Sequence, residues 1–473
     1  MTAPPAGGSD NLERFGYAQQ LKRGMGGFQS FALSFSVISI LTGAVTLYGY
    51  GFKWGGPLVM GLGWPVVAFF TFAIALSMAE LASAFPTAGA LYHWSALLGG
   101  KGAGFATAWL NLVGQVAISA SIDYGLAEFV VALAKLEGGR PMTLLVFAAV
   151  LTSHALLNHF GVRVLTVLNT LSAWYHLLGV AVLVGALVWR APMRPLAELL
   201  QPYSLENEGL RYGFMVALLQ AAWTFTGYDA SAHVSEETVD APRAAPRGIL
   251  LAVGVSAVAG WAMLAAVTLA VPDYDLAAAA DNTFIYVLHG ALGGVGDALV
   301  WMAVGAMYFC GLASVTSNSR MLWAFARDEG VPFSQLLGKV DARFKTPHVA
   351  IWVSVAAALA LGAWADALSV MTALSTAALY ISYVLPVWFG LRARASGRWK
   401  ERGPFHLGRW SSLVNVVALL WVAAVVVLMA LPPNESAGIA LGVTVVLLVV
   451  AWFAGVRRVF GGPKVTLEQL GAR

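Results

Sequence analysis

The amino-acid sequence predicts an all-α polytopic membrane protein, and three observations carry that prediction. Hydrophobic residues make up 59% of the 473 residues and charged residues only 11%, with a mean hydropathy of +0.74, whereas soluble domains carry about 25% charged residues. The apolar residues fall into blocks about as long as a bilayer is thick. These blocks are continuous and do not alternate residue by residue, which argues against a membrane β-barrel.

Twelve apolar blocks, separated by polar or Pro- and Gly-containing segments, predict twelve transmembrane helices. They are residues 28–51, 57–84, 104–134, 141–160, 164–189, 211–234, 247–271, 292–325, 348–365, 367–391, 411–431 and 436–456. The ninth and tenth blocks meet at Asp366 with almost no loop between them. No cleavable signal peptide is expected, because the first block is too long for the apolar core of one.

The distribution of charge predicts that both termini lie in the cytoplasm. An even number of spans places both ends on one side, and most of the 28 Lys and Arg residues lie in the segments on that side. The segments on the other side carry Lys53, Lys135, Arg140, Arg190, Arg194 and Arg211. Positive loops mark the cytoplasmic side, so we expect a multi-pass protein of the cytoplasmic (cell) membrane. The basic cluster 392–409 and Arg457-Arg458 either reflect this topology or bind membrane lipid headgroups.

Two of the blocks contain residues that can interrupt a helix. The first carries Thr42 and Gly43 near its middle, and the sixth carries Thr226 and Gly227 at a comparable depth. Glycine lacks the Cβ that favours helix, so both glycines are predicted unwinding points. Unwound backbone at membrane depth is tolerated only where it lines a buried or water-filled site, and its free N–H and C=O groups attract ions. The alternative is that the glycines only let helices pack closely.

The spacing of these blocks and one acid strengthen the prediction of a site. The first and sixth blocks lie five helices apart, which is what an inverted repeat of five helices each produces. Asp229 follows Gly227 by two residues, and a lone acid at the bilayer centre costs at least about 2.5 kcal/mol. Asp229 is therefore predicted to be a counter-charge to a substrate ammonium or a group that gains and loses a proton. The alternative is a carboxylate that caps the interrupted backbone.

Four stretches of the chain resemble one family of transporters. They are AELASAFPTAGALYHW (79–94), FTGYDASAHVSEET (225–238), SNSRMLWAFARDEGVP (317–332) and GPFHLGRWSSLVNVVALLW (403–421). They are similar to motifs of the amino acid–polyamine–organocation transporter superfamily, and more narrowly of its amino acid/choline transporter branch. The resemblance implies two inverted five-helix repeats followed by two further helices. The division that it implies is a tail 1–27, repeats 28–189 and 190–391, helices 392–456 and a tail 457–473.

The resemblance also implies roles in substrate binding. Thr42 and Gly43 match the end of a Gly-Ser-Gly segment whose backbone amides hold a carboxylate in the family. Leu41 replaces the first glycine of that segment, a departure that fits a branch which also handles γ-aminobutyrate or choline-like amines. Trp223 matches an aromatic residue that gates the site in related exchangers.

Proton coupling is expected at one of two positions. Asp229 matches an acid that takes part in proton coupling in relatives. His176 falls where some relatives place a lysine near a cation site, and it titrates near physiological pH when unperturbed; a His bonded to a helix carbonyl is the alternative. Sodium coupling is less expected, because the family's sodium site uses adjacent hydroxyls and Ala313-Ser314 supplies one, with Ser317 as a possible substitute.

Other charged residues in the blocks are candidates for selection or gating. Asp123 is predicted to select a cationic headgroup or to form a buried hydrogen bond with a Ser or Asn. Asn111 and Gln115 lie earlier in that helix, on roughly the same side. Glu80, expected near Arg243 and Arg247, and Arg320 are interpreted as gating or structural residues. The adjacent residues Arg327-Asp328-Glu329 are interpreted as gate or loop ion pairs.

Aromatic residues near the sixth block complete the candidate binding site. Phe225, Tyr228 and Tyr383 could stack on an ammonium, with each contact worth about 0.5–2 kcal/mol. Core or lipid-facing packing is the alternative for each of them.

The sequence thus predicts a secondary active transporter that moves an amino acid or a γ-aminobutyrate- or choline-like amine by alternating access, with proton coupling. Substrate exchange and a non-transporting amino-acid sensor remain the alternatives. No G-x-x-x-x-G-K-[ST] motif is present, so no nucleotide cofactor is expected. No metal centre or enzyme activity is expected either, since His154 and His159 do not share a helix face. No nucleic-acid partner is indicated.

Overall fold

The computed structural model describes residues 12–203, 209–365 and 368–471. Its elements are helices throughout this part of the chain, and the one pairing of extended backbone is an isolated bridge between Met25 and Thr238. The predicted all-α class is confirmed. Asp366 and the outer parts of both predicted tails, residues 1–11 and 472–473, lie outside the described residues.

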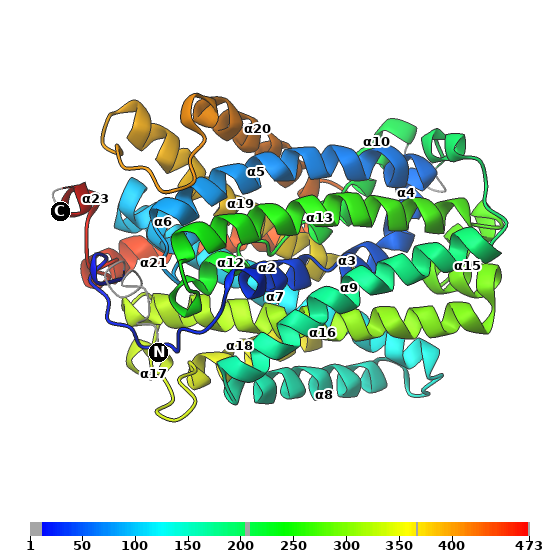
Figure 1. Cartoon of the computed structure of the whole chain (residues 1–473), viewed down its shortest axis with the longest axis horizontal. Coiled ribbons are helices and arrows are strands. Elements are labelled where there is room, and N and C mark those ends of the chain that lie inside the picture. The colour runs from blue at the N-terminus through cyan, green and yellow to red at the C-terminus, as the bar shows by residue number, and fades with distance from the viewer. Residues whose placement is uncertain (1–11, 204–208, 366–367, 472–473) are drawn as a thin grey trace, which may run out of the picture.

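The helices are long and lie side by side (Figure 1). Their bounds are α2 (Gly27–Ile38), α3 (Ile40–Thr46), α4 (Tyr48–Leu58), α5 (Trp64–Ala84), α6 (Leu91–Gly99), α7 (Lys101–Leu133), α8 (Gly139–His159), α9 (Val162–Arg190), α10 (Leu210–Ala217), α11 (Leu219–Thr224), α12 (Ala230–His233), α13 (Ala241–Leu269), α14 (Tyr274–Ala279), α15 (Thr283–Leu292), α16 (Gly294–Arg327), α17 (Ser334–Leu337), α18 (His348–Trp364), α19 (Leu368–Ala395), α20 (Ser411–Met429), α21 (Glu435–Ala451), α22 (Arg457–Val459) and α23 (Leu467–Gly471).

Within the described residues, ten helical stretches are long and apolar enough to cross a bilayer. They are Gly27–Thr46, Tyr48–Ala84, Lys101–Leu133, Gly139–His159, Val164–Arg190, Ala241–Leu269, Gly294–Arg327, Leu368–Ala395, Gly408–Met429 and Glu435–Val459. The chain is therefore a multi-pass membrane protein. Of the twelve predicted blocks, 348–365 forms a shorter apolar helix and 211–234 is divided into α10, α11 and α12.

Burial separates central helices from peripheral ones. The first apolar stretch, which contains α2 and α3, is 89% buried over its most apolar window, whereas the last, which contains α21, is only 6% buried. Figure 1 shows α2 and α3 enclosed by α13, α9 and α16. A helix that is apolar all round and buried belongs to the core, and one that is apolar and exposed faces lipid. The interrupted first helix thus lies at the centre of the bundle.

The first interruption lies at Ser39, where α2 ends and α3 begins. Ser39 has left-handed backbone angles (φ 36°), and its hydroxyl group contacts Thr42 Oγ1 at 2.5 Å and His176 Nε2 at 2.6 Å. Gly43 is helical, and a Cβ there would lie 2.8 Å from the Cα of Thr224 on α11. The prediction that this helix unwinds at Gly43 is therefore wrong: Gly43 serves close helix packing, while hydroxyl and imidazole contacts hold the break at Ser39.

The second interruption lies at Gly227, between α11 and α12, as predicted. Gly227 has φ +80°, and a Cβ on it would fall 2.1 Å from Cγ1 of Val37, near the end of α2. Residues with a side chain rarely adopt that backbone conformation, and there is no room for a Cβ, so both reasons require glycine at this position. The two interruptions consequently face each other in the middle of the bundle.

Candidate functional site

Asp229 is fully buried beside the second interruption, and its carboxylate is held on both oxygens. The Tyr383 hydroxyl group of α19 donates to Oδ1 at 2.9 Å, and Tyr383 in turn accepts the Gly227 N–H at 2.9 Å. Nε2 of His233, one turn later on α12, lies 3.1 Å from Oδ2. Burial of a carboxylate is tolerated only with such partners. Asp229 therefore ties the interrupted backbone to two neighbouring elements.

The predicted polar stripe on α7 also reaches this carboxylate. The side-chain amides of Asn111 and Gln115 lie 3.4 and 3.5 Å from Oδ2 of Asp229. The same two amides donate to the hydroxyl groups of Ser382 on α19 and Ser317 on α16, each at 3.2 Å. Both amide contacts to Asp229 are long, so they make its surroundings polar but contribute little to fixing the carboxylate in place.

His176 lies at the first interruption. Its Nδ1 lies 2.8 Å from the carbonyl oxygen of Ser172, which can only accept, so Nδ1 carries the proton. Its Nε2 then accepts from the Ser39 hydroxyl group at 2.6 Å. The neutral ring has a partner at each nitrogen, which is the arrangement of a His bonded to a helix carbonyl that the sequence left open.

Asp123 is paired with a histidine, where the sequence predicted a Ser or Asn as the alternative to a substrate. Nδ1 of His154 on α8 lies 3.2 Å from Oδ2 of Asp123, and both side chains are fully buried. Oδ1 of Asp123 and Nε2 of His154 have no hydrogen-bond partner. The backbone of Gly311 on α16 covers Oδ1, since a Cβ there would lie 1.9 Å away.

A small cavity lies between the two interruptions. Its volume is about 10 Å³, which is about the space that the centre of one water molecule needs. Its lining consists of Val37, Ile38, Thr42, Gly43, Ile118, Ile122, Trp223, Thr224 and Cys310. The structure thus brings together Thr42, Gly43 and Trp223 of the predicted substrate contacts, and the cavity must widen to hold an amino acid.

The remaining predicted contacts are not among the residues that line this cavity. The Leu41 side chain faces Gly179 of α9, and the Phe225 ring packs on Trp64 with a centroid distance of 4.6 Å. The Thr226 hydroxyl group donates to the Trp223 carbonyl at 2.6 Å. The ring of Tyr228 lies 5.0 Å from that of Tyr383, between centroids.

Glu80 joins helices at one end of the bundle. Its carboxylate lies 2.9 Å from the guanidinium group of Arg394 at the end of α19, and it accepts from the Leu407 N–H and the Ser411 hydroxyl group at 2.9 and 2.8 Å. The ion-pair partner of Glu80 is Arg394, whereas Arg243 pairs with Asp240 at the protein surface. These contacts fit the structural interpretation of Glu80.

Two buried ion pairs connect α16 to the turn after α12. Arg320 lies 2.8 Å from Glu237, with both side chains fully buried, and Arg327 binds Glu236 through two contacts of 2.9 Å. Because the turn continues the second interrupted helix, these pairs fix the position of that helix against α16. Arg320 and Arg327 thus form ion pairs at this end of α16, with partners that the sequence did not indicate.

The N-terminal segment covers the same end of α16. The Tyr17 hydroxyl group donates to Asp328 at 2.8 Å, and the guanidinium carbon of Arg327 lies 3.9 Å from the centre of the Tyr17 ring. Burial, and then the nearby Asp328 carboxylate, raise the pKa of Tyr17, so its hydroxyl group stays a donor. His93 lies 2.9 Å from the same carboxylate. This cluster closes the bundle on that side.

We expect replacement of Arg320 by methionine to lower the free energy of unfolding by about 3–5 kcal/mol, because it leaves Glu237 charged and buried without a partner. Thermal unfolding of the purified protein in detergent measures this. Arg243→Met is the matched control, since its exposed pair is worth less than about 1 kcal/mol. Adding Glu237→Met to Arg320→Met should restore stability; equal melting of Arg320→Met and wild type contradicts the role of the pair.

Sequence reasoning missed His233 as a partner of Asp229. The signal was present, because residues four apart share a helix face and His233 follows Asp229 by four. Its other contact, the Ala88 carbonyl oxygen 3.1 Å from Nδ1, comes from the loop before α6 and could not be read from spacing.

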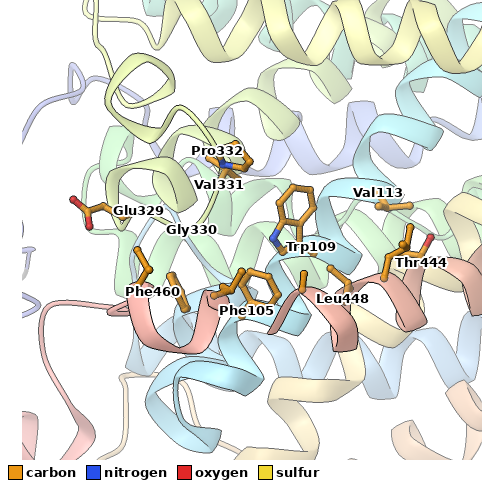
Figure 2. Close-up of a pocket in the computed structure, with 14 residues that line it drawn as sticks. Phe105, Trp109, Val113, Glu329, Gly330, Val331, Pro332, Thr444, Leu448 and Phe460 are labelled. Carbon is orange, nitrogen blue, oxygen red and sulfur yellow. The ribbon is translucent and has the colours of Figure 1, made fainter. Parts of the chain in front are cut away.

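A larger groove lies away from the interruptions, between α7, the loop after α16 and α21 (Figure 2). Its volume is about 630 Å³, and Figure 2 shows Trp109 and Phe105 of α7 beside Leu448 of α21. Glu329 is among its lining residues, but none of the predicted substrate contacts is. The bordering helix α21 is the least buried span, so this groove belongs to the face of the bundle that meets lipid.

Membrane-length helices that enclose two interrupted segments, a buried carboxylate and a small central cavity define a membrane transport protein. The family model described as amino acid permease matches residues 25–456, and the chain belongs to that family. It is a transporter-family protein and not an enzyme.

Relatives extend over most of the chain. The amino-acid permease BAT1 homolog of Oryza sativa subsp. japonica is 36% identical over 513 residues, covering 98% of each chain. The amino-acid permease BAT1 of Arabidopsis thaliana is 37% identical over 459 residues, covering 90% of this chain and 88% of its own. The GABA-specific permease of Saccharomyces cerevisiae is 29% identical over 453 residues, covering 90% and 78%.

Proposed function

We propose that the chain is a secondary active transporter that moves an amino acid or a related small amine by alternating access, driven by protons. The observation that carries this proposal is the fully buried Asp229 at the Gly227 interruption, where the second interrupted helix packs directly on Val37 of the first. Such sites at interrupted helices bind substrates and coupling ions in transporters.

The proposed topology has twelve spans. Residues 28–189 and 190–391 form two inverted five-helix repeats, 392–456 form the last two helices, and the tails 1–27 and 457–473 lie in the cytoplasm. Counting α18 and the divided α10–α12 as spans supports twelve. The concentration of Lys and Arg on one side supports this orientation in the cell membrane.

The proposed substrate is an amino acid or a γ-aminobutyrate-like amine. A relative named GABA-specific permease and relatives named amino-acid permease support this range. The substrate would occupy the cavity between Thr42, Gly43 and Trp223 once it widens. Asp229 would then attract its ammonium group, and the aromatic rings of Phe225 and Tyr228 would border it.

Protons are favoured over sodium by the pairing of hydroxyl groups on α16. Ser314 bonds to Ser119 at 2.7 Å and Ser317 accepts from Gln115. The Val37 carbonyl oxygen, at the end of α2, accepts from the Cys310 thiol at 3.2 Å. Oxygen atoms that would coordinate sodium thus already have partners, whereas the Asp229 carboxylate can bind a proton.

Uptake of alanine, γ-aminobutyrate and choline into proteoliposomes, with and without an inward proton gradient, tests the proposal. We expect one of them to accumulate when the gradient is present. Uptake that ignores the gradient but needs internal substrate identifies an exchanger. Binding without flux of any of the three identifies a sensor, and either result overturns proton-driven transport.

A further inference from the structure

We propose that Asp229 and His233 form one proton-binding site that holds a single proton between Nε2 of His233 and Oδ2 of Asp229. The site deepens the proposed function, on which its role in coupling rests, but the proton itself can be observed without transport. The two atoms lie 3.1 Å apart, and both side chains are fully buried.

The hydrogen bonds of the histidine fix one ring proton. Nδ1 of His233 lies 3.1 Å from the carbonyl oxygen of Ala88. A carbonyl oxygen only accepts, so Nδ1 must carry a proton to satisfy this contact. The neutral ring then presents a bare Nε2 to Asp229, and only a doubly protonated ring presents an N–H there.

The hydrogen bonds of the carboxylate fix its other oxygen as an acceptor. Tyr383 accepts the Gly227 N–H, which directs its own O–H toward Oδ1 of Asp229. Any proton on Asp229 therefore sits on Oδ2, the atom that faces Nε2. The contact is then either a carboxylic acid donating to a neutral ring or an imidazolium donating to a carboxylate, and both contain one proton.

Without that proton, Oδ2 of the Asp229 carboxylate and the lone pair on Nε2 of His233 face each other at 3.1 Å in a fully buried site. A buried negative charge facing a lone pair is strongly unfavourable. One partner must then move. Moving His233 breaks its bond to Ala88, whereas moving Asp229 breaks the bond that it accepts from Tyr383, which binds the Gly227 N–H. Proton loss thus loosens the second interruption.

Among the described residues, the elements packed around the pair present no other counter-charge to it. From α7 and α19 it is faced by the amides of Asn111 and Gln115 and by the Tyr383 hydroxyl group. On the α2 side, Ser34 forms a hydrogen bond with Ser231 of α12. On the α13 side, Gly248 packs against Ser231.

On the α16 side the charged groups are already paired. Ser317 is occupied by Gln115, and Arg320 and Arg327 bind Glu237 and Glu236. Among the described residues, the ion-pair partner of Asp229 is His233. The charge of Asp229 is therefore balanced by the shared proton.

The site is also connected to the closed end of the bundle. The Ala88 N–H lies 3.2 Å from Oε1 of Glu236, which binds Arg327, while the Ala88 carbonyl accepts from His233. One residue of the loop before α6 thus contacts both the proton site and the ion pairs. Release of the proton would free this loop, which gives proton binding a route to opening of that end.

His176 offers the contrasting case. Its neutral ring is satisfied by Ser172 and Ser39, and no acid is paired with it among the described residues. It needs no second proton, so His176→Gln serves as the matched control for a buried histidine at the other interruption.

The test is ¹⁵N spectroscopy of the histidine rings in the full chain, in lipid nanodiscs, from mildly acidic to mildly alkaline pH. The protein has eight histidines, and His233→Gln assigns the His233 signals. Wild type should show Nδ1 protonated throughout and Nε2 exchanging one proton. In Asp229→Asn, the amide N–H donates to Nε2, so Nε2 should stay bare at every pH.

Proton release by the purified variants completes the test. Asp229→Asn and His233→Gln should each remove the same single proton-binding event, and the double variant should remove no more, because coupled groups titrate as a unit. His176→Gln should keep the event. Loss of two separate events in the double variant, or loss of the event in His176→Gln, overturns the proposal.

Each failure can be told apart. If His233→Gln does not fold, the Asp229→Asn spectrum still decides, since a full set of histidine signals that is unchanged from wild type contradicts the shared proton. If the shared proton is observed but no substrate enters liposomes, the proposed transport function fails and the proton site stands. If substrate enters liposomes but the shared proton is not observed, the proton site fails and the proposed transport function stands.

Discussion

Replacing Asp229 with asparagine should reduce proton-driven uptake to the level of empty liposomes while leaving the protein folded. The amide oxygen can accept from Tyr383, and the amide N–H can donate to the bare Nε2 of His233, so both close contacts survive and only the long contacts of Asn111 and Gln115 to Oδ2 are lost. The amide cannot release a proton, and it cannot balance a substrate ammonium. Gradient-driven uptake and thermal unfolding, measured on the same preparation, test this directly.

Asp240→Asn is the matched control, because Asp240 is exposed and pairs with Arg243 at the surface. It should transport as wild type does. Wild-type accumulation in Asp229→Asn would show that the proton is carried elsewhere, and an unfolded Asp229→Asn would show that the carboxylate is needed for folding.

Replacing Gly227 with alanine should unfold or inactivate the protein. A residue other than glycine in left-handed backbone costs about 1–3 kcal/mol, and the new Cβ would also lie 2.1 Å from Cγ1 of Val37. The two interrupted helices meet at this contact, so the damage should reach the cavity. Thermal unfolding and uptake of the purified variant measure both effects.

Two companion variants separate the causes. Adding Val37→Ala should relieve the clash and recover part of the stability, leaving the backbone strain. Gly442→Ala is the control, because Gly442 lies within α21 and a Cβ there meets nothing within 4 Å, so stability should be kept or slightly raised. A Gly227→Ala protein as stable and active as wild type contradicts the tight contact.

Much of the fold was readable from hydropathy, because a bilayer imposes span lengths that soluble folds do not. Ten of the predicted blocks correspond to long apolar helices, and the divided block 211–234 was recognised from Gly227 and Asp229. The position of the first interruption could not be predicted from the sequence. Gly43 and Ser39 were both present, but the break follows the contacts of Ser39 with His176, which joins a helix 137 positions away.

Spacing within one helix leaves a signal of the site in the sequence, and packing between distant segments does not. Asn111 and Gln115 were placed on one face by spacing alone, and both reach Asp229. Arg394 as the partner of Glu80, and His154 as the partner of Asp123, depend on how separate helices pack. Sequence spacing has no access to those contacts.

The most direct measurement of proton-coupled transport is the movement of protons driven by substrate alone. Liposomes that contain the protein are loaded with the substrate that the uptake assay identifies, at equal pH inside and outside. They are then diluted into substrate-free buffer while an internal dye reports pH. Substrate leaving down its gradient should carry protons out and make the interior alkaline in wild type, and not in Asp229→Asn. Substrate efflux with no change of internal pH in wild type would contradict proton coupling.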